Sequence, residues 1–220
     1  MNDRHLPRRK VLGMAVASGL TLLAAPLRSI ALQVTRRTPA QILGPYYPVV
    51  KPTDQDTDLT MIAGRTGRAQ GQVIYVAGRV INRHGQPISG AQMDIWQANS
   101  HGRYTHQSDQ LDAPLDPNFE GYARIVTDAE GRYRIKTIKP GAYPDDSGTL
   151  RPPHIHFEVT GRVNRLVTQL YFAGEPLNDN DRYLISAAGN RGRLIVDLNA
   201  LPGDAEKALS ASWDIVLHDG

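Results

Sequence analysis

The chain has 220 residues, a formal net charge of +3 and no cysteine. This length allows one domain with its own hydrophobic core plus terminal appendages. The lack of cysteine excludes disulfides and thiolate metal sites, so any bound metal would need nitrogen and oxygen ligands.

Residues 1–31 have the pattern of a bacterial export signal. Arg8-Arg9-Lys10 precedes an uncharged, mostly apolar stretch over residues 11–27, and Ser29-Ile30-Ala31 resembles a small-x-small cleavage site. The adjacent arginines resemble a twin-arginine signal, which directs the export of folded proteins. We therefore predict a periplasmic or secreted protein with no stable membrane span after processing. An ordinary signal or an uncleaved anchor is the alternative.

This segment also accounts for the basic charge of the chain. Residues 1–31 contain five arginine or lysine side chains and a single acidic one, Asp3. Because the rest of the chain has no excess of positive charge, its composition does not indicate nucleic-acid binding.

The remainder of the chain predicts an irregular lead followed by an all-β domain. Residues 32–71 are rich in Pro, Gly and polar residues, and the rigid aromatic segment Gly44-Pro45-Tyr46-Tyr47-Pro48 is expected to pack on the body. Residues 72–220 predict an antiparallel β-sandwich with long site-forming loops and little helix. A turn at 128–131 predicts a hairpin, and residues 205–210 predict one or two helical turns. The predicted strands cover residues 73–82, 91–96, 124–127, 132–136, 154–160, 166–172, 194–198 and 212–217.

Two predicted loops, over residues 99–120 and 139–153, are too long to be simple connections. Long ordered loops on a β scaffold often carry functional residues. Each of these loops contains a tyrosine of interest, Tyr104 in the first and Tyr143 in the second. The structural alternative is that Tyr143 bonds a loop backbone and that Tyr104 only packs.

His154 and His156 are one residue apart in a predicted strand, so their side chains point to the same face. Two imidazoles presented in this way can bind one metal ion. Glu158 falls on the same face, and a facial triad of His154, His156 and Glu158 on Fe(II) is therefore one alternative.

Tyr104 and Tyr143 change which metal ion the candidate site is expected to prefer. A phenol has a pKa near ~10, so it ligates as phenolate only to a strongly polarising cation. Zinc rarely recruits tyrosine, and magnesium and calcium prefer carboxylates. Two phenolates and two imidazoles therefore favour non-haem Fe(III).

Several segments together resemble one family, the intradiol ring-cleavage dioxygenases, and most of all its protocatechuate 3,4-dioxygenase branch. The matching segments span nearly all of the chain after residue 43. They are Gly44-Pro45-Tyr46-Tyr47, Ile95-Trp96-Gln97-Ala98-Asn99, Gly102-Arg103-Tyr104, residues 113–119, residues 137–141, Arg151-Pro152-Pro153-His154-Ile155-His156-Phe157, residues 168–172 and residues 214–217.

The resemblance implies an Fe(III) site and a reaction. The metal ligands would be Tyr104, Tyr143, His154 and His156. The reaction implied is O2-dependent opening of a catechol-type ring (protocatechuate, catechol or hydroxyquinol class) between its two hydroxyl-bearing carbons. The product would be a cis,cis-muconate-type diacid, and an oligomer, homo or hetero, is expected.

The resemblance also implies roles for residues around the metal. Arg151 would stabilise negative charge on the substrate, which agrees with the need to offset two phenolates and a catecholate. Tyr143 would accept a substrate proton, Gln169 would support the site, and Trp96 would lie at the substrate pocket. Asp145 stands where this branch has tryptophan, so the substituent on the substrate ring stays open.

A binding module is the alternative to an enzyme. The pattern across residues 78–91 is shared with transthyretin-like β-sandwiches, which are often secreted and act without catalysis. That interpretation explains the strands but assigns no role to Tyr104, Arg151 or the two histidines.

Overall fold

The computed structural model describes residues 35–218, all within a unit that spans Leu32–Gly220. The predicted export signal lies outside the described residues. The strands are β1 (Val73–Ile81), β2 (Gln92–Trp96), β3 (Tyr122–Val126), β4 (Arg132–Ile138), β5 (Tyr143–Pro144), β6 (Leu150–Arg151), β7 (His154–Thr160), β8 (Arg165–Phe172), β9 (Ile195–Val196), β10 (Asn199–Ala200), β11 (Leu209–Ser212) and β12 (Ile215–Val216). The helical segments are η1 (Pro176–Asp179), α1 (Arg182–Ser186) and η2 (Ala188–Arg193).

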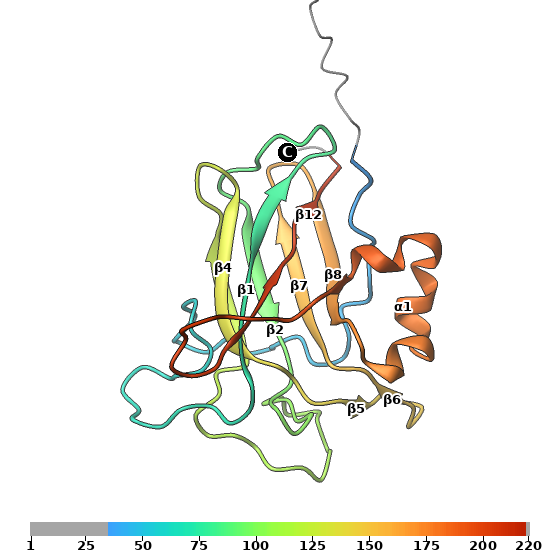
Figure 1. The fold of residues 1–220 in the computed structure, drawn as a ribbon. Helices are drawn as coiled ribbons and strands as arrows, with labels where there is room; N and C mark the ends of the chain where they lie inside the picture. The colour runs from blue at the N-terminus through green and yellow to red at the C-terminus, as the bar shows by residue number, and fades with distance from the viewer. Residues whose placement is uncertain (1–34, 219–220) are drawn as a thin grey trace, which may run out of the picture. The chain divides into compact units, whose positions relative to one another are not determined.

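Two five-stranded sheets form the β-sandwich (Figure 1). In the first sheet, β1 pairs antiparallel with β4 along one edge and parallel with β11 and β12 along the other. The second sheet has the order β3-β2-β7-β8-β9 and is antiparallel except for the β8–β9 pair. The predicted all-β sandwich is confirmed, with the addition of these three parallel pairs.

Strand alternation separates the hydrophobic core from the site on β7. Ile155 and Phe157 are fully buried in the main core, together with residues of β1 such as Val76. His154 and His156 point to the opposite face of the sheet, yet each is only 1% exposed. The outer face of this sheet is therefore covered by other parts of the chain.

Residues 35–71 provide part of this cover. The backbone N–H of Thr38 donates to Val216, that of Gln41 donates to Val167, and that of Leu59 donates to Lys136. Leu59 is fully buried in the core. The lead is thus tied to both sheets although it contains no strand of its own within the described residues.

The predicted hairpin across residues 124–136 is wrong. β3 pairs with β2 and β4 pairs with β1, so the turn at 128–131 passes from one sheet to the other. The turn itself is present, since the Asp128 carboxylate accepts from the backbone N–H of both Glu130 and Arg132. Turn residues define a local reversal of the chain, but they do not decide which edges the flanking strands pair with.

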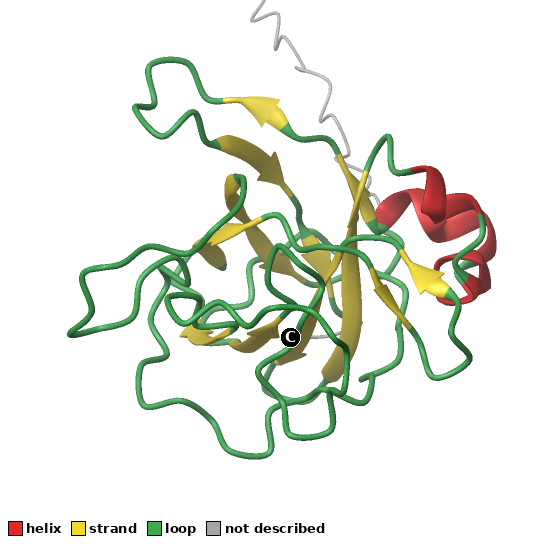
Figure 2. Cartoon of the chain, turned by 90° about the horizontal axis from the view of Figure 1, so that it is seen from below, coloured by secondary structure: helices red, strands yellow, loops and turns green. Residues whose placement is uncertain are grey.

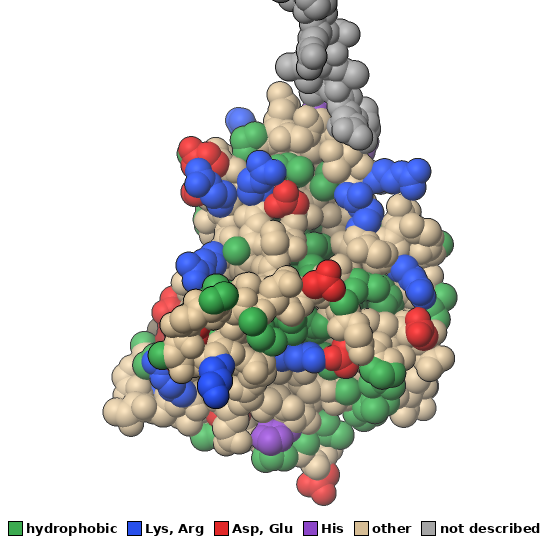
Figure 3. All heavy atoms as spheres, viewed as in Figure 1, with side chains coloured by type: hydrophobic (Ala, Val, Ile, Leu, Met, Phe, Trp, Pro, Cys, Tyr) green, Lys and Arg blue, Asp and Glu red, His purple; other side chains and the backbone are tan. Residues whose placement is uncertain are grey.

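The helical turns predicted at 205–210 are also wrong, and the only α-helix of the described residues, α1, was not predicted. The Asp204 side chain accepts from the backbone N–H of Glu206 and Ala208, which makes a turn, and the chain then enters β11. Among the helices of residues 35–218, none is long and apolar enough to cross a membrane. On the face shown in Figure 3, basic and acidic side chains are interspersed.

Candidate metal centre

The candidate metal centre lies where β2 ends and β7 begins, close to β5 and β6 at the lower end of Figure 1. Figure 2 views this end from below and shows loops running across it. The strand register places Trp96 beside His156, and His156 beside Gln169. The same register places His154 beside Tyr171.

The two imidazoles converge on one point. The Nε2 atoms of His154 and His156 lie 3.2 Å apart. Nδ1 of His154 is 2.7 Å from the carbonyl oxygen of Pro152, which only accepts, so Nδ1 carries the proton and Nε2 keeps a lone pair. Burial, and then the charge of Arg151, hold the pKa of both imidazoles well below the ordinary value, so both are neutral at pH 7. Neutral imidazoles can act as metal ligands.

The two phenols lie against the imidazoles. The Tyr143 hydroxyl is 3.0 Å from Nε2 of His154, and the rings of Tyr104 and Tyr143 lie 5.2 Å apart at right angles. The Tyr104 hydroxyl is buried and has no hydrogen-bond partner among the described residues. Burial raises the pKa of both phenols, so both are protonated unless a cation compensates their charge.

The donor set of this cluster suits a ferric ion. Tyr104, Tyr143, His154 and His156 supply two phenol oxygens and two imidazole nitrogens in a buried space. An unpartnered buried hydroxyl is unusual in a folded protein and indicates a missing partner. A highly charged cation would favour the phenolates and accept the lone pair on Nε2 of His154 in place of its present hydrogen bonds. The structure thus brings together all four side chains that the sequence predicted as ligands.

Two glycines allow the loops that carry the tyrosines to meet. Gly102 has φ +79°, and a Cβ there would collide with the carbonyl oxygen of Ala142, the residue before Tyr143. The N–H groups of Gly102 and Gly141 both donate to the carbonyl oxygen of Asn99. This close backbone contact is what sets Tyr104 next to Tyr143.

Arg151 lies on β6, 3% exposed, and its guanidinium is held on several sides. Nη1 is 3.0 Å from Nε2 of His154. Nη2 donates to Oε1 of Gln169 at 2.8 Å and to the Tyr171 hydroxyl at 2.9 Å. A fixed positive charge therefore lies directly beside the proposed ligands, and Gln169 orients it.

Asp181 is a functional residue that the sequence reasoning missed. Its Oδ2 accepts from Nε of Arg151 at 2.8 Å, and its Oδ1 accepts from the backbone N–H of Leu184 at 2.7 Å. Asp181 is therefore both the N-cap of α1 and the counter-ion of Arg151. An aspartate ahead of an apolar segment is a recognisable cap signal in the sequence, but nothing there indicates the partner 30 residues away.

Trp96 is placed against a ligand. Its ring stacks on His156 with centroids 4.9 Å apart and 11° between the planes, and the ring of Tyr47 lies at right angles to it, also at 4.9 Å. Tyr46, from the lead, covers Tyr104 at a centroid distance of 4.6 Å. These aromatic rings keep water away from the ligand atoms.

Glu158, the third member of the alternative facial triad, forms an ion pair with another side chain. Its Oε1 accepts from Nε of Arg165 at 2.7 Å. The structure therefore does not support the set of His154, His156 and Glu158.

Two hollows adjoin Tyr143. One, of about 370 Å³, is lined by the ring of Tyr46, by Gly102 and by residues 108–112. The other reaches Arg151 and Tyr183. Asp145 and Asp146 line both hollows, and the Asp145 carboxylate forms an ion pair with Arg182.

Comparison with known proteins agrees with this geometry. The Dioxygenase family model (Dioxygenase_C) matches residues 42–219. The protocatechuate 3,4-dioxygenase beta chain of Burkholderia cepacia is 46% identical over 168 residues, which cover 74% of this chain and 72% of that one. Catechol 1,2-dioxygenase of Candida albicans is 35% identical over 121 residues, covering 49% of this chain and 39% of that protein.

A solved structure also aligns with this chain. The dioxygenase domain of a carbohydrate-binding fusion protein from Streptomyces sp. SirexAA-E aligns with a TM-score of 0.64 and 27% identity, covering 84% of this chain and all of that chain. The predicted resemblance is confirmed, and the transthyretin-like binding module is not favoured. The chain belongs to the intradiol ring-cleavage dioxygenase family and is an enzyme of the ring-cleaving type.

Proposed function

We propose that the protein is a non-haem Fe(III) intradiol dioxygenase. It would open the ring of a catechol-type substrate between the two hydroxyl-bearing carbons with O2, giving a cis,cis-muconate-type diacid. The observation that carries the proposal is the buried convergence of two phenols and two imidazoles beside a fixed guanidinium. The relatives named as protocatechuate and catechol dioxygenases support the substrate class.

Tyr104, Tyr143, His154 and His156 would hold the iron. When bound, Fe(III) supplies Lewis acidity and withdraws electron density from a coordinated catecholate. The aromatic cover from Tyr46 and Trp96 excludes water, which strengthens every charge interaction inside the site.

Tyr143 and Arg151 would handle protons and charge. The Tyr143 hydroxyl lies in the cluster, and its residue lines both hollows, so its oxygen is placed to take a proton from a substrate hydroxyl. Arg151 presents a preorganised positive charge to the catecholate and to the negative charge that develops as the ring opens. Asp181 and Gln169 keep this guanidinium in place.

The test is the colour of the iron-loaded protein combined with oxygen uptake. Phenolate-to-Fe(III) charge transfer absorbs visible light, so the purified protein should be red-brown. Tyr104→Phe should lose or shift the band, whereas Tyr75→Phe, a tyrosine on β1 outside the cluster, should leave it unchanged. Arg151→Ala should keep the colour and lose about 10²-fold or more in turnover.

A protein that stays colourless after iron loading would overturn the proposal, and full activity of Arg151→Ala would overturn the role of Arg151. Oxygen uptake with catechol, protocatechuate and hydroxyquinol identifies the substrate. Protocatechuate is the informative member of this panel, because its carboxylate would have to be placed near Asp145 and Asp146, which line both hollows.

We also propose that the enzyme is exported and works as an oligomer. The relative from Burkholderia cepacia is named as a beta chain, which supports an assembly of related chains. Light scattering of the chain expressed alone would show whether copies of it associate without a second type of subunit.

A further inference from the structure

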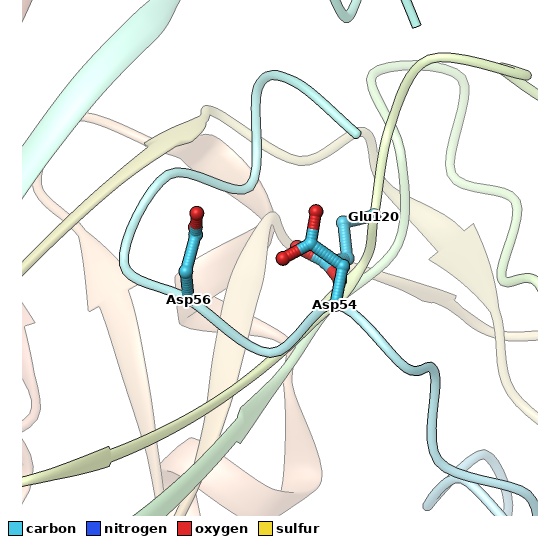
Figure 4. Close-up of side chains that lie close together, drawn as sticks. All are labelled: Asp54, Asp56 and Glu120. Carbon is cyan, nitrogen blue, oxygen red and sulfur yellow. The ribbon is translucent and has the colours of Figure 1, made fainter. Parts of the chain in front are cut away.

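Three carboxylates gather at a place that the proposed iron chemistry does not use. One oxygen from each of Asp54, Asp56 and Glu120 lies within 4.8 Å of the others (Figure 4). Asp54 and Asp56 belong to the lead, and Glu120 ends the long loop that also carries Tyr104. The fold therefore brings together acidic residues that are about 65 positions apart in the sequence.

Glu120 is the unusual member of the cluster. The residue is 8% exposed, and neither of its carboxylate oxygens has a hydrogen-bond partner among the described residues. None of the three carboxylates forms an ion pair within the described residues. Asp94, a buried carboxylate on the adjacent strand β2, shows the ordinary arrangement, since it is bonded to Lys51, Arg124 and Tyr47. Glu120 has no such partner among residues 35–218, and a buried carboxylate anion without a compensating group is strongly unfavourable.

Each of the two aspartates uses only one of its carboxylate oxygens in the hydrogen bonds of the described residues. Asp54 accepts the N–H of Ala63 with Oδ2, and Asp56 accepts the N–H of Asp58 with Oδ1. These bonds fix the orientation of both carboxylates and leave the second oxygen of each available. In Figure 4 the Glu120 side chain reaches toward Asp54.

We propose that Asp54, Asp56 and Glu120 form a binding site for a divalent cation of the calcium class. Two oxygens bound to one calcium ion at about 2.4 Å lie at most about 4.8 Å apart, and the separations in this cluster stay within that limit. The donor set is entirely carboxylate oxygen, which suits hard cations such as calcium, magnesium and manganese. A cavity of about 570 Å³ beside Asp54 and Glu120 leaves room for water to complete the coordination shell.

The positions of the three carboxylates also indicate the role of the bound cation. Burial, and then the charges of Asp54, Asp56 and Asp58, raise the pKa of Glu120 to about 8, which reflects the uncompensated negative charge. A cation would remove this repulsion and tie the lead to the loop of Tyr104. Thr105, the neighbour of Tyr104, lines the same cavity. The site is therefore structural, separate from the iron ligands, and its effect is on stability.

The test uses the full-length, iron-loaded protein after removal of calcium with EGTA, with iron content checked by the visible band. Titration with CaCl2 in a calorimeter should show one equivalent bound, and about 10 mM CaCl2 should raise the melting temperature by about 2–5 °C. Glu120→Gln should weaken calcium binding at least tenfold and abolish the shift. Its melting temperature without calcium should equal or exceed that of the wild type, because the uncompensated charge is gone.

Glu130→Gln is the matched control. Glu130 is an exposed glutamate paired with Arg132 on a turn, so its removal should leave the calcium response unchanged. The proposal is overturned if calcium produces neither binding heat nor a melting shift in the wild type, or if Glu120→Gln binds calcium as the wild type does. A larger response to MgCl2 than to CaCl2 at the same concentration would overturn the assignment to the calcium class.

Discussion

Arg151 brings a full positive charge into a buried site, and Asp181 supplies its counter-charge. The two side chains are 4% and 1% exposed and are joined at 2.8 Å. Breaking one partner of a buried ion pair commonly costs about 3–5 kcal/mol, because the other charge is left uncompensated. The orientation of Arg151 therefore depends on a residue that we do not expect to contact the substrate.

We predict that Asp181→Asn lowers kcat/KM about 10–100-fold while iron content and the visible band are retained. An amide keeps the cap of α1 but no longer balances the guanidinium, so Arg151 loses its fixed orientation toward the substrate. Steady-state oxygen uptake and iron analysis measure both effects. Asp179→Asn is the control, because Asp179 is a nearby aspartate with a 78% exposed side chain. Unchanged kcat/KM in Asp181→Asn would contradict the role.

At the residue scale, sequence reasoning found the groups whose chemistry is local or distinctive. His154 and His156 were identified because alternation along one strand is sufficient to place them together. Asp181 was not, because its bond to Arg151 depends on how α1 docks beside β6. Glu120 was not identified either, since it gains its neighbours Asp54 and Asp56 only through the path of the lead.

Among the elements, the contact between the two long loops determines where the tyrosines lie. Gly102 faces the carbonyl of Ala142 so closely that no side chain fits. We predict that Gly102→Ala separates the loops, lowers the iron content at least severalfold and lowers the melting temperature. Metal analysis and thermal unfolding measure these outcomes.

Gly85→Ala is the appropriate control for this prediction. Gly85 has φ +75°, close to the +79° of Gly102, but a Cβ at Gly85 would have no atom within 4 Å. Both variants therefore carry the same backbone strain, and only Gly102→Ala carries the collision. Equal iron content in the two variants would show that the loop contact does not position the ligands.

The strands themselves were predicted well, and their connections less so. Alternating apolar residues in β1 and β7 indicate strands whatever their neighbours are. Pairing is decided by tertiary structure, which is why the turn at 128–131 joins two sheets and not two paired strands. Likewise, residues 209–212 become β11 because the edge of β1 is available, although residues 205–208 have high helix propensity.

For the whole molecule, the twin-arginine pattern makes a prediction about location. Replacing Arg8 and Arg9 by lysine keeps the charge and the apolar stretch but removes the paired arginines that the export machinery recognises. We expect the variant to remain in the cytoplasm of a host with this pathway, while the unaltered chain is exported. Cell fractionation with immunoblotting measures the difference. Equal export of both forms would favour an ordinary signal.

The stability of the metal-free protein should depend on pH through two opposing effects. The folded-state pKa values of His154 and His156 lie well below 6.5, so below about pH 6.5 the unfolded chain takes up protons that the folded chain does not. The free energy of unfolding then falls with acid, by up to about 2.7 kcal/mol per pH unit for two imidazoles. Glu120 acts in the opposite direction, because its folded-state pKa of about 8 lies above the ordinary value of 4.5.

Of these three groups, only Glu120 affects stability between pH 8 and about 6.5. In that range the free energy of unfolding should rise by up to about 1.4 kcal/mol for each unit by which the pH falls. Below about pH 6.5 the two histidines outweigh the single glutamate, so the wild type should be most stable near pH 6.5. Glu120→Gln should remove the rise between pH 8 and 6.5 and steepen the loss below it. Urea unfolding at intervals from pH 5 to 8.5, with chelator present, measures both curves. Parallel curves for the two proteins would mean that Glu120 is compensated in the folded state without any metal.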